Sequence, residues 1–178
     1  MKKKVALIIA GNGFQHIEYG IPKKMLHDAG YQVITASFQQ GIAVAEDNST
    51  TKVDIIVNEM KAKEYAGIFF IGGPGALDFL DNEISYELIQ NAVHNDIVLG
   101  AICTAPRILA ASGVLQDRKA TGWDGDEQLS AIFTAHEVTY VAQDVVTDGL
   151  IVTAQGPAAA KMWAQEIIEV LKHQETIK

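Results

Sequence analysis

Cysteine is nearly absent from this chain, because Cys103 is the only one among the 178 residues. A single cysteine cannot form an internal disulfide bond or a zinc site made of several thiolates, so the fold must rest on its hydrophobic core. Long apolar runs are also missing, and none approaches the roughly 20 residues that a membrane-spanning helix needs. We therefore expect no membrane partner.

Positive charge is scarce as well: 14 lysines and arginines stand against 22 aspartates and glutamates, which gives a formal net charge of −8. Lys2, Lys3 and Lys4 form the one basic cluster. A protein that binds a phosphate backbone needs a basic stripe, so we expect no nucleic-acid partner. An acidic surface is not attracted to anionic lipid either.

The length and the first residues predict one domain, residues 1–178, in a reducing cytoplasm. A chain of this length buries roughly 70% of the surface that it exposes when unfolded, which is enough for a core of its own. The apolar run Val5–Ala10 follows the three lysines. It is too short for an export segment, and no small-residue cleavage site follows it.

Short apolar segments with the character of buried strands alternate with longer segments of helical spacing. The predicted strands are Val5–Ala10, Tyr31–Ser37, Ile68–Ile71 and Ile97–Ile102. Helical spacing marks residues 84–94 and, more strongly, residues 160–171. Val145–Thr153 contains Asp148-Gly149 in its middle and predicts a hairpin. We therefore expect an open α/β sandwich with a parallel sheet and an antiparallel edge.

Two glycine segments follow predicted strands. Gly11-Asn12-Gly13 lacks the third glycine of a dinucleotide-binding loop, and no acidic residue ends the second strand to hold a ribose, so we expect no nicotinamide or flavin cofactor. Gly72-Gly73-Pro74-Gly75 could leave backbone N–H groups free to hold an anion or a developing oxyanion. It could equally be only a strand-to-helix turn.

Cys103 ends the strand 97–102 and precedes Pro106, which suits the first turn of a helix. A strand, a sharp turn and a helix make up a nucleophile elbow, here with a thiol. A helix N-terminus lowers the pKa of a thiol, so we expect Cys103 to be largely thiolate at neutral pH. The alternative is a small core residue, the usual place of a free cysteine.

Glu18 lies beside the apolar positions Phe14, Ile17, Ile21 and Met25, which recur at helical spacing and predict the buried face of a helix. A carboxylate there is costly unless it is paired or protonated, because burial raises its pKa. A protonated Glu18 could donate a hydrogen bond to a thiolate. The alternative is an edge residue that reaches solvent.

The histidines weaken the case for hydrolysis. A cysteine nucleophile usually has an imidazole base, yet no histidine is adjacent to Cys103 in the sequence. His16, near Glu18, is the one histidine that could reach a pocket. Asp124-Gly125-Asp126-Glu127 lacks the spacing of a calcium loop, so we expect a solvated turn there and no metal site.

Several of these segments together resemble the ThiJ/PfpI family of the class I glutamine amidotransferase-like superfamily, and most of all its Parkinson-disease-protein-like branch. The resemblance runs nearly end to end. It is carried by Val5–Ala10 with Gly13 to Glu18 and Pro22, by Phe70-Ile71-Gly72-Gly73 with Gly75-Ala76, by Ala101-Ile102-Cys103 with Pro106, and by Asp148 to Thr153 with Gly156-Pro157.

The resemblance implies a flavodoxin-like three-layer sandwich, with a mostly parallel sheet and an antiparallel edge hairpin, that forms a homodimer and needs no metal or organic cofactor. It implies Cys103 and Glu18 as the catalytic pair, with a protonated Glu18 hydrogen-bonded to the cysteine. The backbone amides of Gly73 and Thr104, together with Gly72, would form the oxyanion and substrate-binding pocket. Further candidates for the pocket wall are His16, Trp123 and Asp124.

Two positions depart from the family pattern. Many members that act as peptidases or glyoxalases have histidine directly after the cysteine, where this chain has Thr104. Others have histidine in the turn where this chain has Trp123. The Cys103-Thr104 pair is also similar to the family's isonitrile hydratases, but those have aspartate in place of Glu18.

Several functions remain open. The first in rank is a cofactor-free enzyme of glyoxalase III or deglycase type, in which Cys103 adds to a small reactive carbonyl as part of a stress response. The second is a redox sensor, or a chaperone-like stress protein, with little turnover; in the sensor Cys103 oxidises to sulfinate. An amidase, a protease or an isonitrile-hydratase-like enzyme is the remaining alternative.

Overall fold

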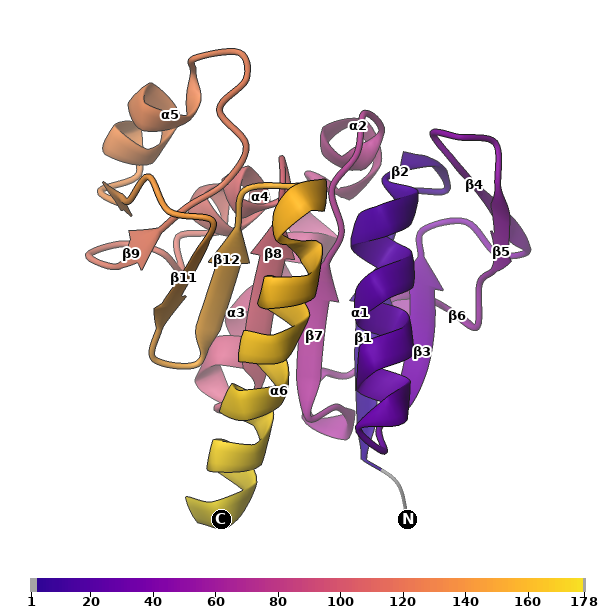
Figure 1. Cartoon of the computed structure of the whole chain (residues 1–178). Helices are drawn as coiled ribbons and strands as arrows, with labels where there is room; N and C mark the ends of the chain where they lie inside the picture. The colour runs from indigo at the N-terminus through magenta and orange to yellow at the C-terminus, as the bar shows by residue number, and fades with distance from the viewer. Residues whose placement is uncertain (1–2, 178) are drawn as a thin grey trace.

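The computed structural model describes residues 3–177 and is built around a central sheet of seven strands (Figure 1). In spatial order the strands are β11 (Val145–Asp148), β12 (Ile151–Ala154), β8 (Val98–Ile102), β7 (Gly67–Phe70), β1 (Lys4–Ile8), β3 (Gln32–Ser37) and β6 (Ile55–Ile56). β11 pairs antiparallel with β12, and all other neighbours pair in parallel. The predicted parallel sheet with an antiparallel edge hairpin is confirmed.

Helices cover both faces of this sheet, so the fold has the three layers that the resemblance implies (Figure 1). One face carries α1 (His16–Asp28) and α6 (Ala160–Ile177), which contact each other. The other face carries α2 (Ala76–Leu80), α3 (Glu83–His94), α4 (Pro106–Ala111) and α5 (Leu129–Ala135). Every residue of β1 from Val5 to Ile8 is fully buried, because the side chains alternate between two covered faces.

The helix α6 shows how the predicted helical spacing becomes packing. Trp163, Ile167 and Leu171 lie along one side of α6 and are fully buried. The indole N–H of Trp163 donates to the carbonyl oxygen of Val152 at 2.9 Å, so the one polar atom of the ring is satisfied inside the core. Burial of such side chains contributes about 2 kcal/mol each.

The predicted buried face of α1 is correct only in part, because Phe14 is buried and Ile21 and Met25 are partly buried against the core, but Ile17 is not. Ile17 is exposed, and the residues of α1 that are buried are Glu18, Tyr19, Pro22 and Leu26. Glu18, Pro22 and Leu26 follow one another at steps of four, so the inward stripe begins with an acid rather than with an isoleucine. The spacing of apolar residues predicts the neighbouring stripe, because a pattern of apolar residues does not include the acid Glu18.

A second, three-stranded sheet lies beside the start of α1. It consists of β2 (Asn12–Phe14), β4 (Ile42–Ala45) and β5 (Thr50–Lys52). β4 runs parallel to β2 and antiparallel to β5, so the turn after β4 is brought close to the first residues of α1. The remaining short elements are β9 (Lys119–Ala120), β10 (Thr139–Tyr140), η1 (Val57–Glu59), η2 (Ala62–Glu64) and η3 (Pro157–Ala159).

Two sequence expectations concern the chain as a whole. Within residues 3–177, no helix combines the length and the apolar character needed to cross a membrane. The predicted single domain runs over residues 1–178, and residues 1, 2 and 178, with Lys2 of the basic cluster among them, lie outside the described residues. The single domain therefore stays a prediction.

Candidate active site

The candidate site lies at the carboxyl ends of the parallel strands, the edge where open α/β sheets bind their ligands. A cavity of about 480 Å³ opens there. Its wall consists of Gln15, Glu46, Gly73, Pro74, Leu77, Cys103, Thr104, Trp123 and Pro157. The predicted pocket residues Cys103, Gly73, Thr104 and Trp123 are thus brought together, although they come from three separate segments of the chain.

Cys103 occupies the sharp turn between β8 and α4. Its φ angle is +66°, a left-handed conformation that non-glycine residues adopt at a cost of about 1–3 kcal/mol. The Cys103 N–H donates to the carbonyl oxygen of Ala154 at 2.9 Å, and the Cys103 carbonyl oxygen accepts from the Trp123 N–H at 2.7 Å. These two hydrogen bonds hold the strained residue in place, as in a nucleophile elbow.

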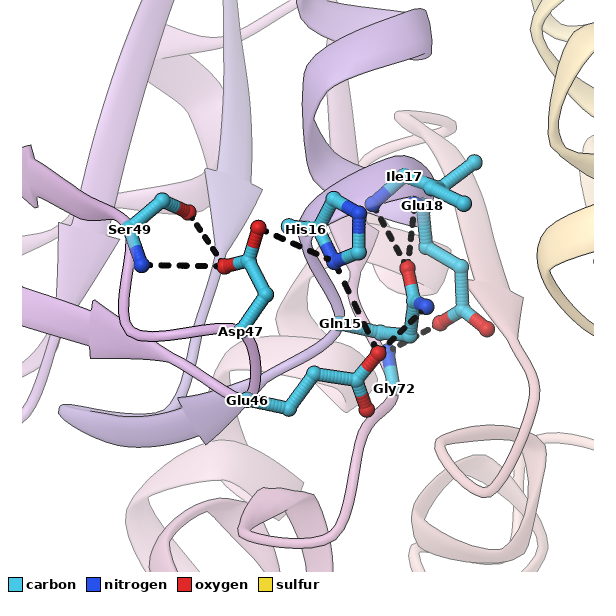
Figure 2. A network of polar contacts seen from close by, with 8 residues as sticks. All are labelled: Gln15, His16, Ile17, Glu18, Glu46, Asp47, Ser49 and Gly72. Atoms are coloured by element: carbon cyan, nitrogen blue, oxygen red, sulfur yellow. Dashed lines mark hydrogen bonds and ion pairs between the residues drawn. The ribbon is translucent and has the colours of Figure 1, made fainter.

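Glycine at position 72 allows an acid to meet this cysteine. The Gly72 N–H donates to Oε2 of Glu18 at 3.1 Å (Figure 2). A Cβ atom at position 72 would lie 2.5 Å from Cβ of Cys103 and 2.7 Å from Oε2 of Glu18, distances that real Cβ atoms do not show. The Glu18 side chain and the Cys103 thiol therefore approach each other across a backbone that has no side chain of its own.

The rest of the glycine turn packs directly on the loop before α1. The Gly75 N–H donates to the carbonyl oxygen of Gly13 at 3.0 Å, and the Gln15 N–H donates to that of Gly72 at 3.0 Å. The Thr104 hydroxyl donates to the carbonyl oxygen of Gly73 at 3.5 Å, which links this turn to the cysteine elbow. Three segments of the site are thus joined through hydrogen bonds.

We expect Gly75→Ala to destabilise the protein by about 3 kcal/mol or more, because backbone must move to admit the methyl group. A Cβ atom at Gly75 would lie 2.0 Å from the carbonyl oxygen of Asn12. Gly20→Ala in α1 is the matched control: its methyl group meets nothing within 4 Å, and we expect a stabilisation of about 0.5–1 kcal/mol. Urea denaturation checks both variants, and equal stability of the two would contradict the close packing of this turn.

Glu18 is fully buried, and burial raises its pKa to about 8. The contact with Cys103 and the Gly72 N–H act against this rise, while the charge of Glu46 adds to it. Below the raised pKa the carboxyl group keeps its proton, so Glu18 is an acid that can donate at neutral pH. Its Oε1 has no hydrogen-bond partner among the described groups and is free to carry that proton.

The predicted lowering of the Cys103 pKa is wrong in direction. Burial and the charge of an ionised Glu18 raise the pKa of the thiol to about 12, against the hydrogen bonds that the Gly73 and Thr104 N–H groups donate to the sulfur. Desolvation of the thiolate therefore outweighs the local N–H groups. Because the thiol and the carboxyl group are in contact, their titrations are coupled.

Most of the sequence and most of the fold match known proteins. The sequence model of the DJ-1/PfpI family covers residues 3–170. The chain belongs to the DJ-1/PfpI family. It is 28% identical to the deglycase PfpI of Pyrococcus furiosus over 168 residues, 93% of this chain and 98% of that protein. It is 24% identical to the glutathione-independent glyoxalase DJR-1.2 of Caenorhabditis elegans over 174 residues, 98% of this chain and 91% of that protein.

The fold agrees with this assignment. The crystal structure of a ThiJ/PfpI domain protein from Brachyspira murdochii superposes with a TM-score of 0.91 at 26% sequence identity. The match covers 97% of this chain and 99% of that one. The resemblance inferred from the motifs and the predicted fold are both confirmed.

Gln15 is a residue of this DJ-1/PfpI site that the sequence did not reveal. Its Oε1 accepts from the N–H groups of Ile17 at 2.6 Å and Glu18 at 3.0 Å, so it caps α1 at the turn that carries the acid (Figure 2). Its Nε2 donates to Oε1 of Glu46 at 2.7 Å. Glutamine is not among the usual cap residues, and Glu46 reaches the site only through the pairing of β2 with β4.

His16 and Asp124, two predicted candidates for the pocket wall, do not line the cavity. Nδ1 of His16 faces the carboxylates of Glu46, at 3.6 Å, and Asp47, at 3.7 Å (Figure 2). Oδ1 of Asp124 accepts from the Leu129 N–H at 2.8 Å and so satisfies the start of α5. Both side chains thus face local partners, and Trp123 is the one of the three candidates that reaches the cavity.

The acidic segment 124–127 is more than the solvated turn that the sequence predicts. The guanidinium group of Arg107 donates to both carboxylate oxygens of Asp126, at 2.9 and 2.7 Å, and to the Trp123 carbonyl oxygen at 3.2 Å. It also lies 5.7 Å from the centre of the Trp123 ring. Arg107 on α4 therefore fixes the turn that places Trp123 in the cavity wall of this DJ-1/PfpI protein.

Proposed function

We propose that the protein is a cofactor-free enzyme in which Cys103 adds to small reactive carbonyls, a glyoxalase or deglycase type of reaction. The proposal rests on one arrangement, a strained cysteine and a buried acid that meet across Gly72 at the end of a 480 Å³ cavity. The names of the matched relatives, a deglycase and a glutathione-independent glyoxalase, support the same reaction class.

In the first step Sγ of Cys103 attacks the aldehyde carbon of a compound such as methylglyoxal. The sulfur–carbon bond forms as the carbonyl π pair moves onto oxygen. Glu18 takes the thiol proton while its own acid proton goes to that oxygen, which gives a neutral hemithioacetal and restores the acid. The N–H groups of Gly73 and Thr104, which point at the sulfur, stabilise negative charge as it shifts from sulfur to oxygen.

In the next steps a proton moves between the two carbons of the former dicarbonyl. Glu18 gives its acid proton to the second carbonyl oxygen while its other oxygen takes the proton from the carbon attached to sulfur, which forms the enediol. Glu18 then gives that proton to the neighbouring carbon and takes the hydroxyl proton of the carbon attached to sulfur. The product is a thioester of lactate, which water cleaves to lactate and the free thiol. Methylglyoxal and water thus give lactate, and the overall reaction balances without an oxidant, a reductant or glutathione.

We expect the purified protein to consume methylglyoxal without glutathione and to release lactate in equal amount. Ultraviolet absorbance of the dicarbonyl and mass spectrometry of the product provide the measurement. Absence of both consumption and lactate would contradict the proposed reaction.

Redox sensing is a second function that the contact between Glu18 and Cys103 supports. A buried acid that donates to sulfur stabilises the sulfinate state, so we expect mild peroxide to oxidise Cys103 by two oxygen atoms and then stop. Two peroxide molecules are reduced to two waters in that conversion. Intact-mass spectra of the wild type and of Glu18→Gln, which keeps the volume but not the acid, provide the comparison. Identical rates and end points would remove Glu18 from the redox role.

The other expectations have less support. No histidine lines the cavity within residues 3–177, so an amidase or protease lacks the usual imidazole base. The homodimer that the resemblance implies stays a prediction, which light scattering in solution would contradict by giving the molar mass of one chain. The cytoplasmic location, the stress role and the chaperone-like activity stay predictions as well.

A further inference from the structure

One feature of the cavity plays no part in the proposed reaction, namely the carboxylate of Glu46. Glu46 follows β4 and belongs to the cavity wall, whereas the acid that contacts the cysteine, Glu18, is fully buried behind that wall. Of the wall residues, Glu46 is the only one whose side chain carries a full charge at neutral pH in its ordinary state. The charge that a ligand meets on entry is therefore negative.

The position of this carboxylate is fixed on one side and free on the other. Oε1 of Glu46 accepts from Nε2 of Gln15 at 2.7 Å and lies 3.6 Å from Nδ1 of His16 (Figure 2). Within residues 3–177, no group donates a hydrogen bond to Oε2. The Glu46 side chain is about one-third exposed, at 33%. A donor on a ligand can thus reach a carboxylate whose orientation is already set.

The rest of the wall offers no positively charged side chain to balance an anion. Apolar surface comes from Pro74, Leu77, Trp123 and Pro157. Arg107 lies beside Trp123, but Asp126 holds its guanidinium group through two hydrogen bonds. His16 is the nearest group that could neutralise Glu46, and it lies outside the wall.

The charge of Glu46 also reaches the reacting groups. It contributes to the raised pKa of Glu18, so the field of this carboxylate extends to the acid beside Cys103.

We infer that Glu46 makes the cavity selective for organic cations, so that the preferred substrates are carbonyl compounds that carry an ammonium or guanidinium group beside an apolar part. Neutral carbonyls bind more weakly, and anionic ones such as 2-oxo acids bind least. The inference rests on the proposed function for the reaction, but its binding part stands without turnover. A carboxylate opposite a cation in a half-buried apolar cavity is the arrangement that favours such ligands.

The test uses three unreactive probes of similar size, namely benzylamine, benzyl alcohol and phenylacetate, with calorimetry as the readout. We expect wild-type protein to bind benzylamine about fivefold to tenfold more tightly than benzyl alcohol, and phenylacetate most weakly. Glu46→Gln, which keeps an acceptor for Gln15, should bring the amine and the alcohol to within about twofold. Asp47→Asn is the matched control: it removes the same charge from the next residue, outside the wall, and should keep the preference.

Three results would overturn the inference: no detectable benzylamine binding by the wild type, equal binding of amine and alcohol, or a preference that survives in Glu46→Gln. Circular dichroism verifies that each variant is folded. Methylglyoxal consumption, measured in parallel, separates the two proposals. Turnover without charge preference would overturn the selectivity alone, and charge preference without turnover of methylglyoxal would support the selectivity while contradicting the proposed reaction.

Discussion

Replacing Cys103 with serine should reduce methylglyoxal consumption to the rate that is measured without protein. The proposed reaction begins with a bond to Sγ, and each later intermediate stays attached to that sulfur, whereas a serine hydroxyl is a far weaker nucleophile unless a base activates it. Loss of a covalent nucleophile costs roughly a thousandfold or more in rate. The side chains have almost the same shape, so the Cys103→Ser variant should fold, which circular dichroism verifies.

His16→Gln is the informative control for that loss. The side chain of His16 lies against Glu46 and Asp47 rather than in the cavity wall, so we expect this variant to retain activity. Retained consumption in Cys103→Ser would refute the cysteine mechanism. Loss of methylglyoxal consumption in His16→Gln alone would instead indicate that an imidazole performs the chemistry that we assign to the thiol and the acid.

The second large effect is the dependence of the free energy of unfolding on pH, and it comes from Glu18. Its pKa in the folded protein is about 8, above the ordinary value of 4.5 that applies when the chain is unfolded. Between these values the folded state holds a proton that the unfolded state has lost. The free energy of unfolding therefore falls as pH rises through that window, by up to about 1.4 kcal/mol per pH unit and by several kcal/mol in total.

Glu18→Gln removes this titration, so its free energy of unfolding should vary less with pH than that of the wild type. The variant should become the more stable of the two as the pH approaches about 8, because a buried amide has no charge to desolvate. Urea denaturation between about pH 5 and about pH 8 gives the comparison. Glu169→Gln on the exposed side of α6 is the control, and we expect it to follow the wild type. Parallel pH curves for wild type and Glu18→Gln would show that Glu18 is ionised in the folded state.

Much of the fold follows from local patterns in the sequence. The four parallel strands β1, β3, β7 and β8 were predicted to within about two residues at each end, because short apolar runs suit strands that helices cover on both faces. The short strands, β6 of the central sheet among them, were not predicted. The elbow at Cys103 was predictable from a strand, small residues and Pro106. The closing hairpin was predictable from Asp148-Gly149.

The parts that escaped prediction depend on contacts between distant segments. Glu46 reaches the cavity because β2 pairs with β4, and the register of that pairing is not visible in either strand alone. Arg107 and Asp126 meet only after α4 and the following turn fold over each other. The inward face of α1 was predicted only in part because a buried acid, Glu18, occupies a place where the packing pattern calls for an apolar residue.

Glu46 and the reacting groups belong to different parts of the architecture, and this separation matters for how the protein can change. Cys103 and Gly72 follow strands of the central sheet, whereas Glu46 sits in the turn that leaves β4 of the small sheet. A designer, or natural variation, could therefore exchange that turn to admit molecules of another charge while the elbow that carries the thiol stays in place. Gln15, which contacts both Glu46 and the helix turn of Glu18, would be the residue to keep in such an exchange.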